Sequence, residues 1–340
     1  MSSSFMGKYK STIILTLALA VFLASCKGAT DDPKSWVVTT LAGGFNEPSG
    51  VDVDSSGNVY VADINNHRIR KITPTGEVST FAGGTYGHQD GVGEAAQFIF
   101  PYGVAVDSSG NIYVAEFLGN RIRKITPKRV VSILAGSTTG GRGTTNGAGD
   151  TALFDGPRGV AVDSSGENVY VAGYANNIIR KITISPAGVG TVSRFAGSAT
   201  QAAGDDDGDG LTDAQFDGPS GVAVDSSGNV YVGDTHNNRI RKITSDRVVS
   251  TFAGSTWGHK DATGEAAQFN YPRGVAVDSS GNLYVADMFN NRIRKITPTK
   301  EVSTIAGEFN IPHGVAVDSS GSIVYVGDTH SNRIRKIEYK

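Results

Sequence analysis

The chain has 340 residues, a formal net charge of −2 and one cysteine, so it has neither the basic excess that neutralises nucleic-acid phosphates nor an internal disulfide framework. Its 44 glycines and short valine-rich runs between turn-forming residues favour strands over helices. Composition and charge therefore exclude nucleic acid as an expected partner and predict an all-β domain.

The first predicted element is an export signal. Lys8 and Lys10 precede an apolar stretch at 11–24, which is short for a membrane span and is followed at once by polar residues. The stretch ends in LASC, which resembles the lipobox of bacterial lipoproteins. The resemblance implies that residues 1–25 are a lipoprotein signal peptide and that Cys26 carries the lipid anchor.

A polar tether is predicted next. Residues 26–35 comprise the lipidated cysteine and this tether, and residues 36–340 form the folded domain. Loss of residues 1–25 removes two of the 31 basic side chains and none of the 33 acidic ones, which leaves a formal net charge of −4. We therefore expect a lipid-anchored protein of the bacterial cell envelope (outer membrane, periplasmic or surface-exposed), and the sequence leaves open which membrane and leaflet hold the anchor.

Six copies of one pattern fill the remaining chain. Each begins with a proline, at Pro48, Pro101, Pro157, Pro219, Pro272 and Pro312. Each copy predicts short strands of the types GVAVD, NVYVA and RIRKI, and all but the last predict a fourth such as EVSTFAG. DSSGN between the first two strands has the composition of a hairpin turn. Repetition of a four-stranded unit at this spacing predicts radial closure, which protects the strand edges.

The pattern P-x-G-V-A-V-D-x-x-G-N-x-Y-V-x-D-x-x-N-x-R-I resembles the NHL repeat. The resemblance implies an all-β fold, a six-bladed β-propeller of four-stranded blades. The last copy lacks a fourth strand, and residues 37–43 match the fourth strand at 302–307. We predict that the N-terminal strand 37–43 completes the last blade and closes the ring.

Acidic residues end the second predicted strand in five copies, which could suggest a ring of metal ligands. An arginine follows five residues after each acid, and the third copy lacks both, with Gly173 and Ile178 in their places. Their joint absence favours an ion pair within each blade over a metal site. The innermost strands, nearly invariant GVAVD, are expected to line the channel with alanine and valine and to offer no ligands below its rim.

The loops that connect the blades differ most between copies, so the face that carries them is the candidate binding surface. The predicted residues of this face are Tyr86, Phe100, Tyr102, Arg158, Trp257, Tyr271, Arg273, His313 and His330. We expect a horseshoe of long loops around an opening, with Tyr86 and Trp257 facing each other as stacking platforms for sugars or peptides. The alternative is a variable rim without function.

The loop entering the fourth blade contains an acidic motif. Asp205, Asp207, Asp209 and Asp213 occupy positions one, three, five and nine of a calcium-loop spacing with glycine at position six. Phe216 stands at position twelve, where such loops place a glutamate. The motif predicts a structural calcium site, and the alternative is the ordinary connecting loop with added charge. No other cofactor is expected.

The resemblance and the sequence together favour a binding scaffold that recognises a protein, peptide or glycan on the loop-bearing face. The alternative is a metal-dependent propeller enzyme of the lyase or lactonase type. Six-bladed enzymes similar to this family place metal-binding carboxylates, amides or histidines at the channel. The histidines of this chain show no metal-ligand spacing, so the sequence indicates no catalytic residue.

Overall fold

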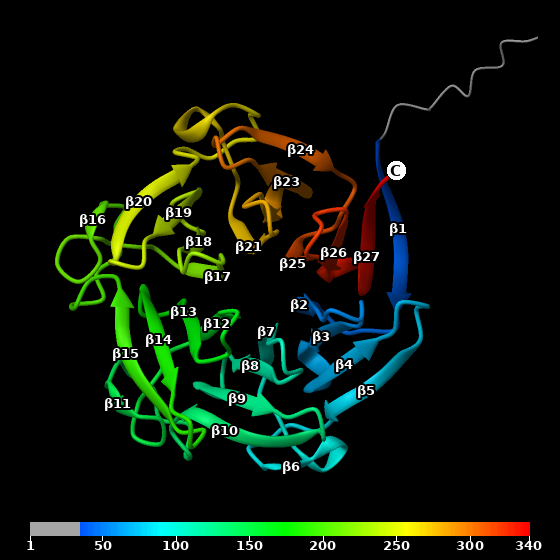
Figure 1. Cartoon of the computed structure of the whole chain (residues 1–340), viewed down its shortest axis with the longest axis vertical. Coiled ribbons are helices and arrows are strands. Elements are labelled where there is room, and N and C mark those ends of the chain that lie inside the picture. Colours follow the sequence, from blue (N-terminus) through cyan, green and yellow to red (C-terminus); the bar gives the residue numbers. More distant parts are fainter. Residues whose placement is uncertain (1–34) are drawn as a thin grey trace, which may run out of the picture. The chain divides into compact units, whose positions relative to one another are not determined.

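A computed structural model describes residues 35–340. The predicted signal peptide, Cys26 and nearly all of the tether lie outside the described residues. Six antiparallel sheets surround a central axis, with the first strand of each repeat innermost (Figure 1). Among the described residues, no helix has the length and apolar character needed to cross a membrane.

Every blade contains four main strands, which follow chain order from the channel outward in blades 1 to 5, whereas the outermost strand of blade 6 is the N-terminal strand. Blades 1 to 3 comprise β2 (Pro48–Val53), β3 (Val59–Asp63), β4 (Arg68–Ile72) and β5 (Val78–Gly83); β7 (Pro101–Val106), β8 (Ile112–Glu116), β9 (Arg121–Ile125) and β10 (Val130–Gly136); and β12 (Pro157–Val162), β13 (Asn168–Gly173), β14 (Ile178–Ile184) and β15 (Gly190–Ala196). Blades 4 to 6 comprise β17 (Pro219–Val224), β18 (Val230–Asp234), β19 (Arg239–Ile243) and β20 (Val248–Ala253); β21 (Pro272–Val277), β22 (Leu283–Asp287), β23 (Arg292–Ile296) and β24 (Val302–Ala306); and β25 (Pro312–Val317), β26 (Ile323–Asp328), β27 (Arg333–Tyr339) and β1 (Trp36–Gly43).

The N-terminal strand closes the ring as predicted. β1 pairs antiparallel with β27, so that Val38 lies opposite Ile337 and the two ends of the folded chain form one sheet. The strand begins one residue earlier than predicted, and the Trp36 ring packs 5.0 Å from that of Tyr339. Residues 36–340 thus contain every strand of a closed ring, so this stretch is a complete folding unit.

Three blades carry a fifth, two-residue strand that the sequence did not reveal. The connecting loops supply β6 (Gly91–Val92), β11 (Gly147–Ala148) and β16 (Gly208–Asp209), which pair with the outermost strands β10, β15 and β20. These loops therefore follow the outer edge of the ring, as Figure 1 shows, and do not rise only as a horseshoe around the opening. Short 3₁₀ turns occur at η1 (Ile64–Asn66), η2 (Gly93–Ala95), η3 (Gly264–Ala266), η4 (Met288–Asn290) and η5 (Thr329–Ser331).

The glycine two residues after each repeat proline is required by close packing at the channel. A Cβ on Gly50 would lie 2.5 Å from the Tyr102 carbonyl oxygen, and one on Gly314 would lie 2.1 Å from the Ser49 carbonyl oxygen. The first strands of neighbouring blades therefore approach more closely than any larger residue allows. The same contact recurs between successive blades around the ring, including across the closure.

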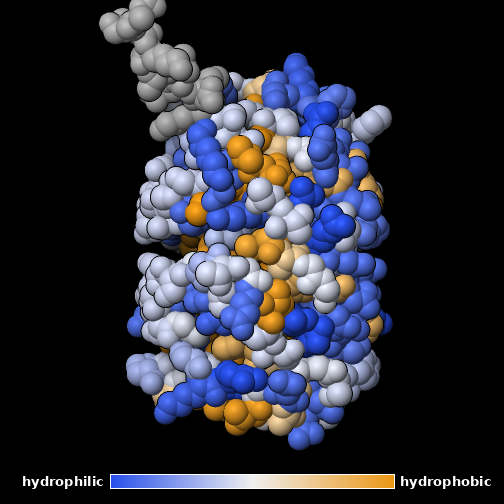
Figure 2. Space-filling view, turned by 90° about the vertical axis from the view of Figure 1, so that its right-hand side faces the viewer, coloured by the Kyte–Doolittle hydropathy of each residue, from blue (hydrophilic) through white to orange (hydrophobic). Residues whose placement is uncertain are grey.

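The hydrophobic core lies between blades, because each apolar cluster combines side chains of two neighbours. One cluster contains Tyr113 of blade 2 with Val171 of blade 3, and another joins Val59 of blade 1 to Tyr325 of blade 6. The outer surface is mixed: Figure 2 shows small apolar patches between hydrophilic side chains on one edge of the ring. Stability thus depends on the complete circle of blades.

In the five blades that have it, the acid at the end of the second strand pairs with an arginine of the third strand, but the predicted arginine is its partner only in blades 1 and 2. Arg68 binds Asp63 at 2.8 Å, as predicted, whereas Asp234 binds Arg241 at 2.9 Å and leaves Arg239 to another partner. Alternate residues share one face of a strand, so arginines five and seven residues beyond the acid both reach it. The other pairs are Glu116 with Arg121 and Arg123, Asp63 with Arg70, Asp287 with Arg294 and Asp328 with Arg335.

Candidate functional site

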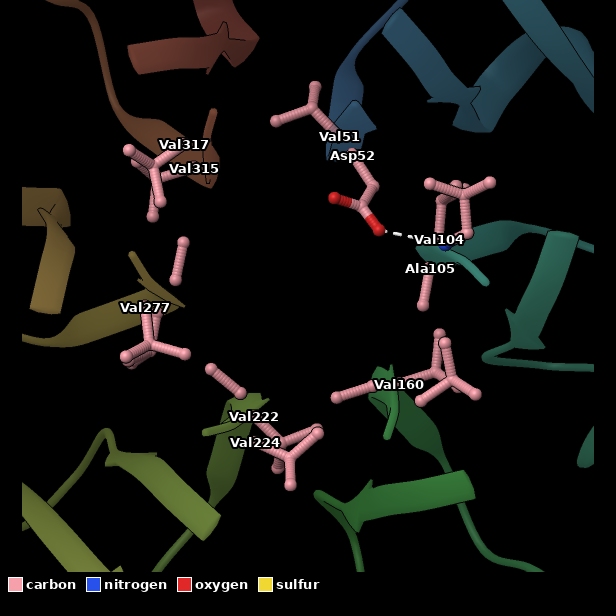
Figure 3. A pocket seen from close by; sticks show the side chains of 16 residues that line it. Val51, Asp52, Val104, Ala105, Val160, Val222, Val224, Val277, Val315 and Val317 are labelled. Atoms are coloured by element: carbon pink, nitrogen blue, oxygen red, sulfur yellow. Dashed lines mark hydrogen bonds between the residues drawn. The ribbon is translucent and has the colours of Figure 1, made fainter. Parts of the chain in front are cut away.

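The channel wall is formed by the six innermost strands and is mainly valine and alanine, as predicted (Figure 3). It encloses a cavity of about 140 Å³. Asp52 is the exception, because blade 1 has GVDVD where the other blades have GVAVD. Its carboxylate accepts hydrogen bonds from the backbone N–H groups of Val106 at 2.7 Å and Val53 at 2.8 Å. Burial raises the pKa of Asp52 to about 6.

Asp52 corrects the expectation of a channel without ligands below the rim. The signal was present in the sequence as one departure from the repeat. A single carboxylate on an apolar wall is a weak cation ligand, because divalent ions require several oxygen donors. Among the described residues, no group of three or more His, Cys, Asp or Glu side chains has an arrangement that could hold a metal ion.

The mouth of the channel, on the loop-bearing face, collects from each blade one residue at a position of the repeat that varies around the ring. Each of these residues directly follows the proline that begins a first strand, so the six are related by the repeat. We call this set the mouth ring: Ser49, Tyr102, Arg158, Ser220, Arg273 and His313. They surround a cavity of about 50 Å³, which admits one small functional group.

Three members of the mouth ring form one hydrogen-bonded group. Arg273 Nη1 lies 2.6 Å from both the Tyr102 hydroxyl and His313 Nε2, and His313 Nδ1 lies 3.2 Å from the same hydroxyl. The Tyr102 and His313 rings are stacked, with centroids 5.9 Å apart. Burial and the nearby guanidinium groups hold the pKa of His313 well below its usual range, so the imidazole is neutral at physiological pH.

Arg158 occupies an aromatic pocket in the same ring. Its guanidinium carbon lies 3.3 Å from the ring centroid of Tyr174, 4.9 Å from that of Phe117 and 5.1 Å from that of Tyr102. Within residues 35–340, its Nε and Nη1 atoms are buried and have no hydrogen-bond partner. Burial lowers the pKa of Arg158 below its usual value. A guanidinium stacked on three rings is held rigidly at the mouth.

The aromatic contacts continue along the face beyond the mouth ring. The Tyr174 hydroxyl and His236 Nε2 are hydrogen-bonded at 3.0 Å. The other ring nitrogen, His236 Nδ1, lies 2.9 Å from an Asp217 carboxylate oxygen. His236 packs against Tyr271, whose ring centroid lies 4.9 Å from that of Phe289. The rings over blades 2 to 5 form a continuous belt, which we call the aromatic belt: Phe117, Tyr174, His236, Tyr271 and Phe289.

The sequence missed four members of this belt: Phe117, Tyr174, His236 and Phe289. They lie in the loops between the second and third strands, within two residues of the strand-ending position. The available signal was that these loop positions differ from blade to blade, as the residues after the prolines do. Phe289 is 48 % exposed, so the belt is open to a partner at this end.

The structure brings together some predicted face residues and separates others. Tyr102, Arg158, Arg273 and His313 meet at the mouth, and Tyr271 belongs to the aromatic belt. The remaining predicted residues do not belong to the mouth ring: Phe100 and Tyr86 pack against His67, and His330 is exposed.

Tyr86 and Trp257 lie on loops of blades 2 and 5, which are opposite in the ring (Figure 1). Their side chains are 61 % and 74 % exposed. Each residue forms an isolated bridge with the phenylalanine twelve positions later, Phe98 or Phe269, which fixes the two loops in the same way. Their use as stacking platforms stays a prediction.

The aspartates of the predicted calcium loop have protein partners. Asp207 binds Arg241 at 2.5 Å, and Asp205 binds the first arginine of β19 at 2.9 Å. Asp213 accepts a hydrogen bond from the backbone of Asp209 at 3.3 Å, which fixes the loop itself. Calcium binding would have to compete with these interactions, and it stays a prediction.

Comparison with known proteins extends these observations. The NHL repeat family matches residues 45–72, 216–243, 269–296 and 309–337, and a family described as beta-propeller repeat matches residues 93–115. The chain is 28 % identical to protein SUPPRESSOR OF QUENCHING 1 of Arabidopsis thaliana over 75 % of this chain, and 29 % identical to NHL repeat-containing protein 2 of Bos taurus over 76 %. It spans 25 % and 40 % of the length of these relatives.

Solved structures share the fold at low sequence identity. An auxiliary nutrient binding protein of Bacteroides thetaiotaomicron matches with a TM-score of 0.64 and 16 % identity, over 90 % of this chain and 77 % of its own. Virginiamycin B lyase of Staphylococcus aureus matches with a TM-score of 0.58 and 15 % identity, over 90 % and 100 %. A gluconolactonase of Xanthomonas campestris matches at 0.64 and 13 %, over 91 % and 95 %. The chain is therefore a six-bladed β-propeller that contains NHL repeats.

Proposed function

We propose that this protein is a cell-envelope binding scaffold, lipid-anchored through Cys26, that recognises a protein, peptide or glycan on its loop-bearing face. One observation carries the proposal: the mouth ring collects one position of the repeat from every blade, which varies among serine, tyrosine, arginine and histidine on an otherwise repetitive frame. Residues needed only for the fold recur in every blade, so differences concentrated at one opening indicate recognition. The Bacteroides neighbour, named as a nutrient binding protein, supports this proposal.

An array of immobilised glycans and peptides, probed with purified residues 36–340, tests the binding proposal. We expect a defined class of ligand to bind, and Tyr102→Ala to weaken that binding because it removes a ring and a hydroxyl from the mouth. Val189→Ala is the matched control. Val189 is 57 % exposed in the turn between the third and fourth strands of blade 3, which lies on the face opposite the mouth. Equal loss in both variants, or no binding to any probe, would refute the proposal.

The lipid anchor is tested separately. The mass of the mature protein, purified from membranes of an expressing bacterium, should correspond to residues 26–340 plus acyl chains. Cys26→Ala should move the protein to the soluble fraction. A membrane-bound Cys26→Ala protein would contradict lipidation at this residue.

An enzyme of the lyase or lactonase type is the second candidate, because Asp217, His236 and Tyr174 form a hydrogen-bonded chain beside the mouth. A carboxylate that orients a histidine next to a hydroxyl is a common arrangement for proton transfer. Elemental analysis of purified residues 36–340, followed by assays on lactone substrates, tests this candidate. One tightly held transition ion per chain with turnover would support it, and a metal-free protein without turnover would leave the binding scaffold.

A further inference from the structure

Among the described residues, the two arginines of the mouth ring have neither a carboxylate partner nor a hydrogen bond to a backbone oxygen. Arg121, Arg241 and Arg294 all bind carboxylates. Arg180 belongs to the blade that lacks the acid, and there it donates to backbone oxygens, among them that of Leu153 at 2.8 Å. Within residues 35–340, neither mouth-ring arginine forms an ion pair.

Arg158 and Arg273 thus place two positive charges at one opening. The neutral His313 beside Arg273 adds none, and the Nε atoms of both arginines are buried without a hydrogen-bond partner among the described residues. A partly desolvated charge without a counter-ion is costly, so an anion at the mouth would offset the charge of both guanidinium groups. This local charge opposes the formal net charge of the whole chain, −2.

The hydrogen bonds also leave one donor free. A guanidinium can only donate, so His313 Nε2 accepts from Arg273 and the imidazole proton lies on Nδ1, from which it is donated to the Tyr102 oxygen. That oxygen also accepts from Arg273 Nη1. Its own hydrogen is therefore available to an acceptor outside the described residues, beside both guanidinium groups.

The size of the mouth and the aromatic belt restrict the ligand further. The cavity of about 50 Å³ holds a single group such as a carboxylate, so the rest of the ligand must lie on the surrounding face. Tyr174, Tyr271 and the exposed Phe289 offer apolar surface there, which suits the flat faces of sugar rings. We infer that the mouth ring binds the carboxylate of an acidic sugar, with Arg158, Arg273 and the Tyr102 hydroxyl as its donors. This inference rests on the proposed binding function.

Calorimetric titration of residues 36–340 with trigalacturonate and with its methyl ester tests the inference. The two probes share their sugar rings and differ in charge. We expect the acid to bind at least about tenfold more tightly than the ester, because charged hydrogen bonds contribute about ten- to hundredfold in affinity. Arg273→Gln should reduce this ratio towards one. Arg158→Lys, which keeps a charge but loses the planar group, should reduce it in part.

Arg142→Gln is the matched control, because it removes one positive charge from an exposed position on the loop entering blade 3. It should leave the acid-to-ester ratio unchanged, and thermal melting checks that each variant is folded. Equal binding of acid and ester, with both weakened by Tyr102→Ala, would overturn this inference and leave the proposed function intact. Preference for tetraglutamate over trigalacturonate would overturn the sugar class. Absence of binding to every glycan and peptide probe would overturn both proposals.

Discussion

Asp52 makes the stability of the propeller depend on pH, because it is an acid where the other blades have alanine. Asp52→Ala restores the repeat, which has Ala105, Ala161, Ala223, Ala276 and Ala316 at this position. Burial raises the pKa of Asp52 from 3.8 to about 6. At about 1.4 kcal/mol per pKa unit this shift corresponds to roughly 3 kcal/mol against the ionised folded state. The side chain keeps part of its surface exposed on the channel wall, so screening reduces the cost to about 1–2 kcal/mol.

The sign of the effect follows from the direction of the shift. Below pH 3.8 the Asp52 carboxyl is protonated in the folded and unfolded states, and the cost is absent. As the pH rises from 3.8 to about 6, the unfolded state ionises while the folded state keeps the proton, so the wild-type protein loses stability relative to Asp52→Ala, and the loss is complete above about pH 6. Loss of the hydrogen bonds from Val106 and Val53 lowers the stability of the variant by a roughly constant amount at every pH.

Urea unfolding of residues 36–340, followed by circular dichroism between pH 4 and pH 8, measures this difference. The free energy of unfolding of Asp52→Ala minus that of wild type should rise by about 1–2 kcal/mol across the window. Asp52→Asn, which keeps the shape and an acceptor but does not titrate, should show the same rise. A difference that stays constant with pH in both variants would refute the reasoning.

Further predictions concern the ring and its acidic loop. Arg241→Met should lower the free energy of unfolding by about 3–5 kcal/mol, because it leaves the buried Asp234 unpaired. Urea unfolding measures this loss. An effect below about 1 kcal/mol would contradict a structural ion pair. Deletion of residues 36–43 removes the outer strand of blade 6, so we expect loss of cooperative thermal unfolding. A cooperative transition at the wild-type temperature would show that the ring does not need this strand. Asp207→Asn should destabilise the protein in EDTA as well as in calcium, since Asp207 also binds Arg241; destabilisation only in calcium would identify the loop as a metal site.

Much of the fold could be predicted because the same strand pattern occurs in six copies along the chain. The prolines located the first strands, and the unmatched strand at residues 37–43 specified how the ring closes. The two-residue strands β6, β11 and β16 could not be predicted, since they are held by pairing with a neighbouring strand and have no periodicity of their own. The ion-pair partners were predicted only in part, because two arginines on one strand face reach the same acid.

The candidate site was predicted less completely than the fold. Comparison of the repeats identified Tyr102, Arg158, Arg273 and His313, which meet at the mouth because equivalent positions of a ring converge on its axis. It did not show which of the other variable residues would join them. Asp52 was overlooked because it is one departure in a strand that otherwise repeats as GVAVD, although it is a partly buried carboxyl on an apolar wall and burial raises its pKa.

The central claim is that ligands bind at the channel mouth of the loop-bearing face. A crystal structure of residues 36–340 with the tightest-binding probe of the array tests it most directly. We expect ligand density between Arg158 and Arg273, in contact with the Tyr102 hydroxyl and extending over Tyr174. Ligand density confined to the outer edge of the ring, or to the opposite face formed by the DSSG turns, would contradict it.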